Sequence, residues 1–169
     1  MPVGVPKVFY SPDPEEETGQ WMDLYNCLFR LRYLFLCNDL KEELTNQLIG
    51  ILLYLNFDQE NLSTIYVFIN SLGGDMVAGL GLVDMMGYVR ADVSTVCIGT
   101  AASMASFVLM GGFPGKRVAM KNCRTMLHQP AGENRGQGTI VHREAEEMVR
   151  LRTAVVDMYV DVRRFAYEH

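Results

Sequence analysis

The chain has 169 residues, 49% of them hydrophobic, which suits one domain built around a single core. Lys and Arg number 15 against 20 Asp and Glu, and no Lys/Arg-rich run is present, which argues against nucleic acid or an anionic membrane as a partner. No uninterrupted apolar run approaches the ~20 residues of a membrane span.

The first 20 residues are predicted to form an irregular arm in front of one domain over residues 21–169. Prolines and three consecutive glutamates fill the arm, and it contains no arginine, the opposite of a transit peptide. We therefore expect no imported precursor. The four cysteines show neither a CxxC pair nor metal-like spacing with the three histidines, so we expect reduced, mostly buried thiols.

Apolar residues spaced three and four apart predict two helices, over Trp21–Phe35 and Glu42–Leu55. The spacing of apolar residues then changes. Ile65–Ile69 is a continuous β-branched and aromatic run, which predicts a strand covered on both faces. A turn signal at residues 70–74 and a helix over Met76–Tyr88 follow it.

The strand, turn and helix then occur a second time. Val93–Ile98 predicts a strand, Gly99–Ser103 a turn and Ala105–Met110 a helix, and Lys116–Met120 and Arg124–His128 predict two short strands. Strands that alternate with helices imply an α/β fold with a mainly parallel sheet. The two turns would open at the same carboxyl edge, where such folds place their ligands.

The last third of the chain predicts one long helix, over Thr139–Arg163. Its apolar stripe consists of Met148, Leu151, Val155, Met158 or Tyr159, and Val162. Because no further element follows it, we expect part of the cover for this stripe to come from another subunit.

Ser103 lies between a predicted strand and a predicted helix, where free N–H groups would face an oxyanion, so it is a candidate nucleophile. His128 ends a strand-like segment and is a candidate general base. Gly73 and Gly74 could present a backbone N–H without a Cβ in the way. Each residue also has a structural interpretation: a packing serine, a structural histidine and a plain turn.

Three known motifs are not matched. The pattern G-x-S-x-G fails because Ala101 and Ala105 flank the serine. GLGLVD (residues 79–84) is a partial dinucleotide-binding motif, but it lies inside a predicted helix rather than at a phosphate-binding turn. GGFPGKR (residues 111–117) resembles a P-loop only by its Gly-Lys, because Met110 replaces the first glycine and Arg117 replaces the final Ser or Thr. Neither of these last two segments therefore supports a nucleotide site.

Three segments taken together resemble the signature segments of the Clp protease proteolytic subunit family. They are FINSLGG (68–74), GTAASMASF (99–107) and MLHQPAG (126–132). The opening MPVGVPKV and the segment NQLIG (46–50) are most similar to the plastid-encoded branch of plants and algae.

The resemblance implies repeated β-β-α units with a mainly parallel sheet and a protruding C-terminal "handle" helix. It also implies a serine endopeptidase whose subunits stack as a double heptameric ring, as a homo- or hetero-oligomer. An AAA+ Clp chaperone would feed unfolded polypeptide to this ring. The chaperone uses the ATP, so this chain would bind no cofactor and no metal. The expected location is the chloroplast stroma, without a transit peptide.

The resemblance also assigns roles to residues. Ser103 would be the nucleophile and His128 the general base. Gly74 and Met104 would supply the N–H groups of the oxyanion hole. Substrate would lie as an added strand between the segment after Gly74 and the loop around residues 132–138, with Gly73, Asp75 and Gly132 binding it.

The sequence departs from the family pattern at three places. Leu72 replaces a proline, which predicts a less rigid loop, and Asp75 would oppose an oxyanion if its charge faced the site. The triad aspartate of the family lies beyond the handle helix, whereas this sequence stops at His169. Asp157 and Asp161 lie within the helix and are poor substitutes. The single domain is therefore expected to be truncated after the handle helix.

Loss of the orienting carboxylate costs a serine triad about 10⁴-fold in turnover. Two alternatives to a working peptidase therefore stay open. One is a catalytically impaired structural subunit of the same ring. The other is a crotonase-like acyl-CoA enzyme, which shares the fold and a two-amide oxyanion hole.

Overall fold

The computed structural model describes residues 4–11, 19–57, 62–128, 131 and 136–165. The elements, in chain order, are β1 (Lys7–Tyr10), β2 (Gln20–Asp23), α1 (Leu24–Arg30), β3 (Tyr33–Leu36), α2 (Glu42–Phe57), β4 (Ile65–Ser71), α3 (Met76–Tyr88), β5 (Val93–Ala102), α4 (Met104–Met110), β6 (Arg117–Ala119), β7 (Arg124–Met126) and α5 (Gly138–Phe165). Five of the strands form one sheet in the order β3-β4-β5-β6, with β7 also paired to β5. Every pair in this sheet is parallel, which confirms the predicted α/β class.

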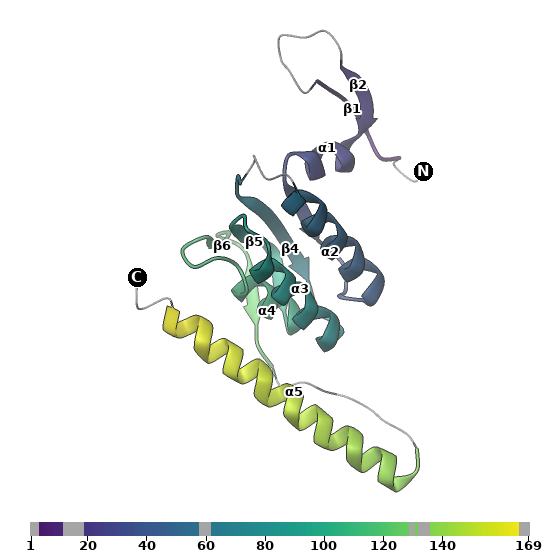
Figure 1. The fold of residues 1–169 in the computed structure, drawn as a ribbon, viewed down its shortest axis with the longest axis vertical. Helices are drawn as coiled ribbons and strands as arrows, with labels where there is room; N and C mark the ends of the chain where they lie inside the picture. The colour runs from purple at the N-terminus through teal and green to yellow at the C-terminus, as the bar shows by residue number, and fades with distance from the viewer. Residues whose placement is uncertain (1–3, 12–18, 58–61, 129–130, 132–135, 166–169) are drawn as a thin grey trace.

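The core lies between this sheet and helices α2, α3 and α4, which cover one of its faces (Figure 1). Alternate residues of a strand point to opposite faces, so one set from each strand enters the core. Leu34, Leu36, Ile65 and Ile69 are fully buried in this way. They meet side chains such as Leu52 of α2 in a single apolar cluster.

The other face of the sheet carries aromatic side chains. Tyr33 and Phe35 of β3 alternate with the buried leucines and contact Tyr66 and Phe68 of β4, with the Phe35 and Phe68 rings stacked at 5.5 Å. Tyr66 keeps 38% of its surface exposed. The prediction that β4 is covered on both faces is therefore wrong for this chain by itself.

The predicted helix over Trp21–Phe35 is wrong at both ends. Only residues 24–30 are helical, because Arg32 takes a positive φ of 66° that ends the helix. The buried Arg32 guanidinium donates to the carbonyls of Ser63 (3.2 Å) and Leu55 (3.4 Å). Residues 33–36 then join the sheet beside β4, so pairing overrides the helical spacing.

The sequence predicted no regular element before residue 21, but β1 and β2 form a two-stranded antiparallel hairpin. Phe9 and Trp21 are opposite each other and meet edge to face with ring centroids 5.7 Å apart. The Arg30 guanidinium lies over the Tyr10 ring. One cross-strand aromatic contact thus supports the hairpin itself, and the cation–π contact links the hairpin to α1.

Strand β5 runs past its predicted end at Ile98 and continues to Ala102, so the predicted turn at residues 99–102 is wrong. Residues 100–102 stay in the strand because they pair with β7. On the other side, Asn70 lies at a register shift, and its side-chain oxygen accepts the Thr100 N–H at 3.1 Å. A Cβ on Gly99 would lie 2.5 Å from that oxygen, which only glycine avoids. The register shifts here, and Ser71 becomes the partner of Ala101. The two turns that follow β4 and β5 therefore begin side by side, as predicted.

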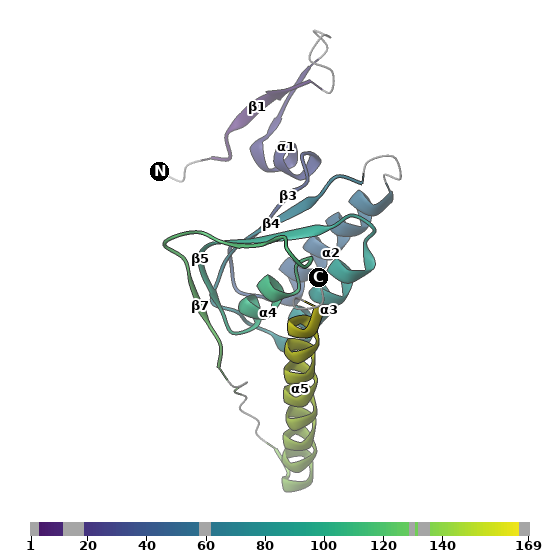
Figure 2. The ribbon, with the colours of Figure 1, turned by 90° about the vertical axis from the view of Figure 1, so that its left-hand side faces the viewer.

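Helix α5 projects away from the sheet, and its C-terminal half lies beside α4 (Figures 1 and 2). Val155, Met158 and Tyr159 of its predicted stripe pack against the core of this same chain. The side chain of Val162 lies outside the described residues. In the described part of the chain, no helix combines the length and the apolar character needed to cross a membrane.

The four cysteines are free thiols, but only Cys97 is buried; Cys37 is exposed and Cys27 and Cys123 are half-buried. The expectation of mostly buried thiols is therefore wrong. Burial raises the pKa of the Cys97 thiol, the Gly99 backbone acts in the opposite direction, and a hydrogen bond with Cys123 raises it further. At neutral pH Cys97 is a packed apolar side chain rather than a nucleophile.

Candidate active site

Ser103 stands in a strained turn between β5 and α4. Its φ and ψ are 53° and −127°, and only Arg32 shares a positive φ among the described non-glycine residues. Such a conformation costs about 1–3 kcal/mol and persists only where the surroundings enforce it. Here the Ser103 N–H donates to the Met126 carbonyl at 2.9 Å, and the Ser103 carbonyl accepts the Ser106 N–H at 3.0 Å.

The small residues around Ser103 allow this turn to form in a crowded place. Ala101 and Ala105 are fully buried, and Ala102 is 1% exposed. In the pattern G-x-S-x-G these flanking positions are glycines that permit a sharp turn from strand to helix. Alanine serves the same purpose here, because the small residues pack closely and still leave the serine half-exposed.

Gly73 lies directly behind Ser103. Its φ is +101°, and a Cβ built on it would lie 2.8 Å from Ser103 Cβ and 3.0 Å from the Met104 nitrogen. The turn after β4 and the turn after β5 are therefore in van der Waals contact. Gly73 is buried and does not line the cavity beside Ser103, whereas its neighbour Leu72 is 70% exposed.

Gly74 is held by the backbone of Leu40. The Leu40 N–H donates to the Gly73 carbonyl, and the Asp75 N–H donates to the Leu40 carbonyl, both at 2.8 Å. A Cβ on Gly74 would overlap that Leu40 carbonyl. Within the described part of the chain, neither the Gly74 N–H nor the Met104 N–H has an acceptor. Two amide donors next to the serine are thus left free.

His128 reaches this edge through strand β7. Met126 is the register partner of Ala102 in the parallel pair of β5 and β7. Ser103 and His128 therefore both lie just past the carboxyl ends of their strands, at the same edge of the sheet. The imidazole is exposed. The contacts described for this chain include no hydrogen bond between His128 and Ser103, and none between His128 and a carboxylate.

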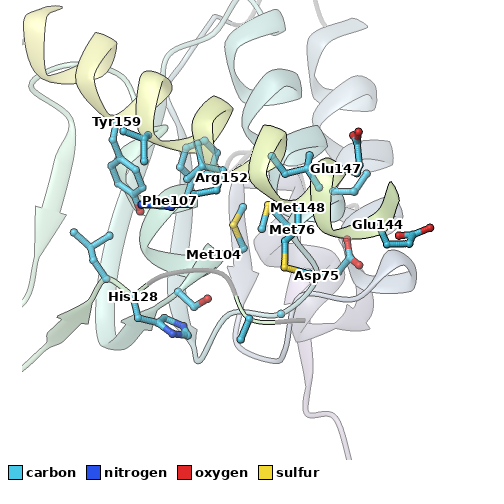
Figure 3. Close-up of a pocket in the computed structure, with 18 residues that line it drawn as sticks. Asp75, Met76, Met104, Phe107, His128, Glu144, Glu147, Met148, Arg152 and Tyr159 are labelled. Atoms are coloured by element: carbon cyan, nitrogen blue, oxygen red, sulfur yellow. The ribbon is translucent and has the colours of Figure 1, made fainter. Parts of the chain in front are cut away.

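One cavity of about 630 Å³ joins these groups. Ser103, His128, Gly74, Met104 and Asp75 all line it. In Figure 3, His128 lies on one side of the cavity and helix α5 on the other, with Glu144, Glu147, Met148, Arg152 and Tyr159 along it. The residues predicted from the sequence thus form one wall of the site, and the wall formed by α5 was not predicted. The predicted substrate residue Gly132 lies outside the described residues, although Ala131 lines the cavity.

Asp75 is occupied by a structural task. Its carboxylate accepts the Ala78 N–H at 2.8 Å and forms the N-cap of α3. Its negative charge is therefore held at the positive end of this helix, where it stabilises the free N–H groups of the first turn.

Replacing Asp75 tests this capping role. We expect Asp75→Ala to lower the free energy of unfolding by about 1 kcal/mol, because the cap is lost, and Asp75→Asn to retain most of it. Urea unfolding of the three proteins measures the difference. Equal losses in both variants would show that the charge, and not the cap, is what matters.

Tyr159 and Ser106 form a contact that the sequence did not predict. The two hydroxyl oxygens are 3.2 Å apart, and the Tyr159 ring meets the Phe107 ring edge to face at 5.3 Å. Burial raises the pKa of Tyr159, and its hydrogen bond with Ser106 acts in the opposite direction. The phenol is therefore neutral, and able to donate a proton, at physiological pH.

Metal ligands are not grouped at this site. Among the residues that the structure describes, no three His, Cys, Asp or Glu side chains are placed to hold a metal ion.

Comparison with known proteins identifies the family of this chain. The family model described as Clp protease matches residues 15–168. The chain belongs to the Clp protease family. Members of this family are serine peptidases, which agrees with a strained serine, an imidazole and two free amides around one cavity.

Three algal relatives carry the name ATP-dependent Clp protease proteolytic subunit. The protein from Oltmannsiellopsis viridis is 54% identical over 94% of this chain and 80% of its own length. The protein from Ostreococcus tauri is 52% identical, over 96% of this chain and 80% of its own length. The one from Chlorella vulgaris is 50% identical, over 94% and 78%. These relatives come from green algae, which is consistent with the predicted similarity to the plastid-encoded branch of the family.

Proposed function

We propose that Ser103 and His128 perform the peptide hydrolysis of this Clp protease subunit. Ser103 Oγ attacks the carbonyl carbon of the substrate while a ring nitrogen of His128 takes the hydroxyl proton. The resulting oxyanion is held by the N–H groups of Gly74 and Met104. Collapse expels the amine, which receives the proton from His128, and water then hydrolyses the acyl-enzyme by the same route.

The observation that carries this proposal is the contact between the turns after β4 and β5. It places the two unpaired amides of Gly74 and Met104 beside a serine in a strained conformation. Strain of this kind is typical of functional sites. Close packing between helix and sheet accounts for the alanines, and the Met104 N–H is free because this residue begins α4. Neither explains why the Gly74 N–H also stays unpaired at the same cavity.

We propose that substrate binds as an added strand. The backbone from Gly74 to Val77 borders the cavity on one side, and Ala131 borders it on the other. An extended peptide between them would pair with backbone groups and place its side chains in the pocket. This arrangement suits unfolded polypeptide, because the backbone N–H and C=O groups of an unfolded segment are free to pair along its length. Gly132, which follows Ala131 in the sequence, would bind substrate on this second side.

The chain works within a complex with Clp chaperones, as its family does. We propose a double heptameric ring, formed with copies of itself or with related subunits and fed by an AAA+ chaperone, which uses the ATP. This chain would bind no cofactor. The half-exposed aromatic face of β3 and β4 and the length of α5 beyond the sheet support further subunit contacts. The proposed location is the chloroplast stroma.

His128 provides the test of the base. We expect His128→Ala to lower kcat on a fluorogenic peptide by about 10⁴-fold in the assembled enzyme, with the fold unchanged because the side chain is exposed. His142→Ala is the matched control, since this histidine is 75% exposed and outside the cavity. A His128→Ala enzyme that keeps its turnover would remove His128 from the mechanism.

A structural ring subunit is the second candidate. It is favoured by one observation: His128 has no hydrogen bond to Ser103 or to a carboxylate in the described contacts. Hydrogen bonds of catalytic groups often tighten only when substrate binds, so this geometry does not decide between the two. A serine-reactive fluorophosphonate does, because a structural subunit in the assembled ring would stay unlabelled.

A further inference from the structure

The cavity wall formed by α5 is linked by hydrogen bonds to the nucleophile's own backbone. Ser106 Oγ donates to the Ser103 carbonyl at 2.6 Å, and the Tyr159 hydroxyl lies 3.2 Å from Ser106 Oγ. A serine hydroxyl has a single proton, and Ser106 uses it on the Ser103 carbonyl. The direction of the second bond follows: the Tyr159 hydroxyl donates to Ser106.

Ser103 is clamped at both ends of its strained backbone. Its N–H is fixed to the Met126 carbonyl, which restrains φ. Its carbonyl accepts three donors, namely the N–H groups of Ser106 (3.0 Å) and Phe107 (3.4 Å) and the Ser106 hydroxyl (2.6 Å). The hydroxyl bond lies at the short end of the normal range for O–H···O bonds, so Ser106 adds a side-chain restraint on the carbonyl whose ψ is −127°.

The packing around this chain of hydrogen bonds is tight. Ser106 is 6% exposed and Phe107 is 1% exposed, and the Tyr159 ring is held edge to face against Phe107. A hydrogen bond in such surroundings is stronger than in water and orients its partners. Ser106 alone could bond its own helix turn as serines commonly do. The donation from Tyr159, 53 residues away in sequence, is the unusual part.

We propose that Tyr159 is a positioning residue for the nucleophile: its hydroxyl orients Ser106, and Ser106 fixes the carbonyl of Ser103 in the conformation that presents the serine to substrate. The inference rests on the proposed role of Ser103. It predicts an effect on the chemical step and not on substrate binding, because neither hydroxyl of the chain needs to touch the peptide.

The test is a double-mutant cycle in the assembled enzyme. Tyr159→Phe keeps the ring and removes only the hydroxyl. We expect a 3- to 10-fold lower kcat, with KM unchanged, and an equally reduced rate of labelling by a fluorophosphonate, of the size a lost neutral hydrogen bond gives. Ser106→Ala should lower kcat at least as much. The double variant should match Ser106→Ala alone, because Tyr159 acts only through Ser106.

Tyr88→Phe is the matched control, since Tyr88 is 69% exposed at the end of α3. Melting temperature and ring assembly are measured for every variant. If Ser106→Ala does not assemble, Ser106→Cys replaces it in the cycle, because a thiol fills similar space and donates weakly.

Three results would overturn the inference. They are full kcat in Tyr159→Phe, a change in KM alone, and losses that multiply in the double variant, as expected if Tyr159 touched the substrate directly. Failure of the proposed function looks different: the wild-type enzyme would show no activity that depends on Ser103.

Discussion

Ser103→Ala should abolish peptide hydrolysis by the assembled enzyme, with kcat lowered by at least about 10⁴-fold. Alanine keeps the Cβ and therefore the same backbone strain at φ 53°, so the turn between β5 and α4 should be preserved. The loss would thus report the missing hydroxyl and not a rearranged site. A fluorogenic peptide assay measures it, with size-exclusion chromatography to confirm assembly.

Ser63→Ala is the control for this variant. Ser63 is exposed and does not line the cavity, so its hydroxyl should be dispensable for turnover. Substantial hydrolysis by Ser103→Ala in a preparation free of other peptidases would place the nucleophile elsewhere.

Gly73→Ala should damage both stability and activity. The new methyl group would lie 2.7 Å from the Ala102 carbonyl oxygen and 2.8 Å from Ser103 Cβ, at a φ of +101° that alanine avoids. We expect the free energy of unfolding to fall by about 2–4 kcal/mol. We also expect kcat to fall by about 100-fold or more, because relief of the clash moves the nucleophile away from the amides by a fraction of an ångström to 1 Å.

Gly81→Ala separates this effect from that of any glycine replacement. Gly81 lies inside α3, where a Cβ would meet nothing within 4 Å. Alanine should therefore raise the free energy of unfolding by about 0.5–1 kcal/mol and leave kcat unchanged. If Gly73→Ala behaved like Gly81→Ala, the contact between the two turns would not be part of the active site.

The sequence predicted the fold correctly wherever the local spacing of apolar residues favours the same element as strand pairing in the sheet. The continuous apolar run predicted strand β4, the helix expected over Met76–Tyr88 has the bounds of α3, and the alternation of strands and helices predicted the parallel sheet. The prediction of one helix over residues 21–35 failed because the spacing of apolar residues there suits a helix, whereas residues 33–36 gain more by pairing with β4. Such pairing is a tertiary effect that a local pattern does not contain.

The candidate site was predicted in part. Three separated segments pointed to Ser103, His128, Gly73, Gly74 and Gly132. The structure brings Ser103, His128 and Gly74 to one cavity and places Gly73 directly behind the serine, while Gly132 lies outside the described residues. The role of Asp75 as an N-cap could have been found, since Asp before a helix is a standard signal. The contact between Tyr159 and Ser106 could not, because it depends on how α5 docks onto α4.

The most direct measurement of the central claim is the site of covalent labelling by a fluorophosphonate in the assembled enzyme. Peptide mass spectrometry should find one adduct, on the peptide that carries Ser103, and the adduct should form far more slowly in His128→Ala. An assembled and active enzyme that carries the label on another serine, or that leaves Ser103 unmodified, would contradict the account.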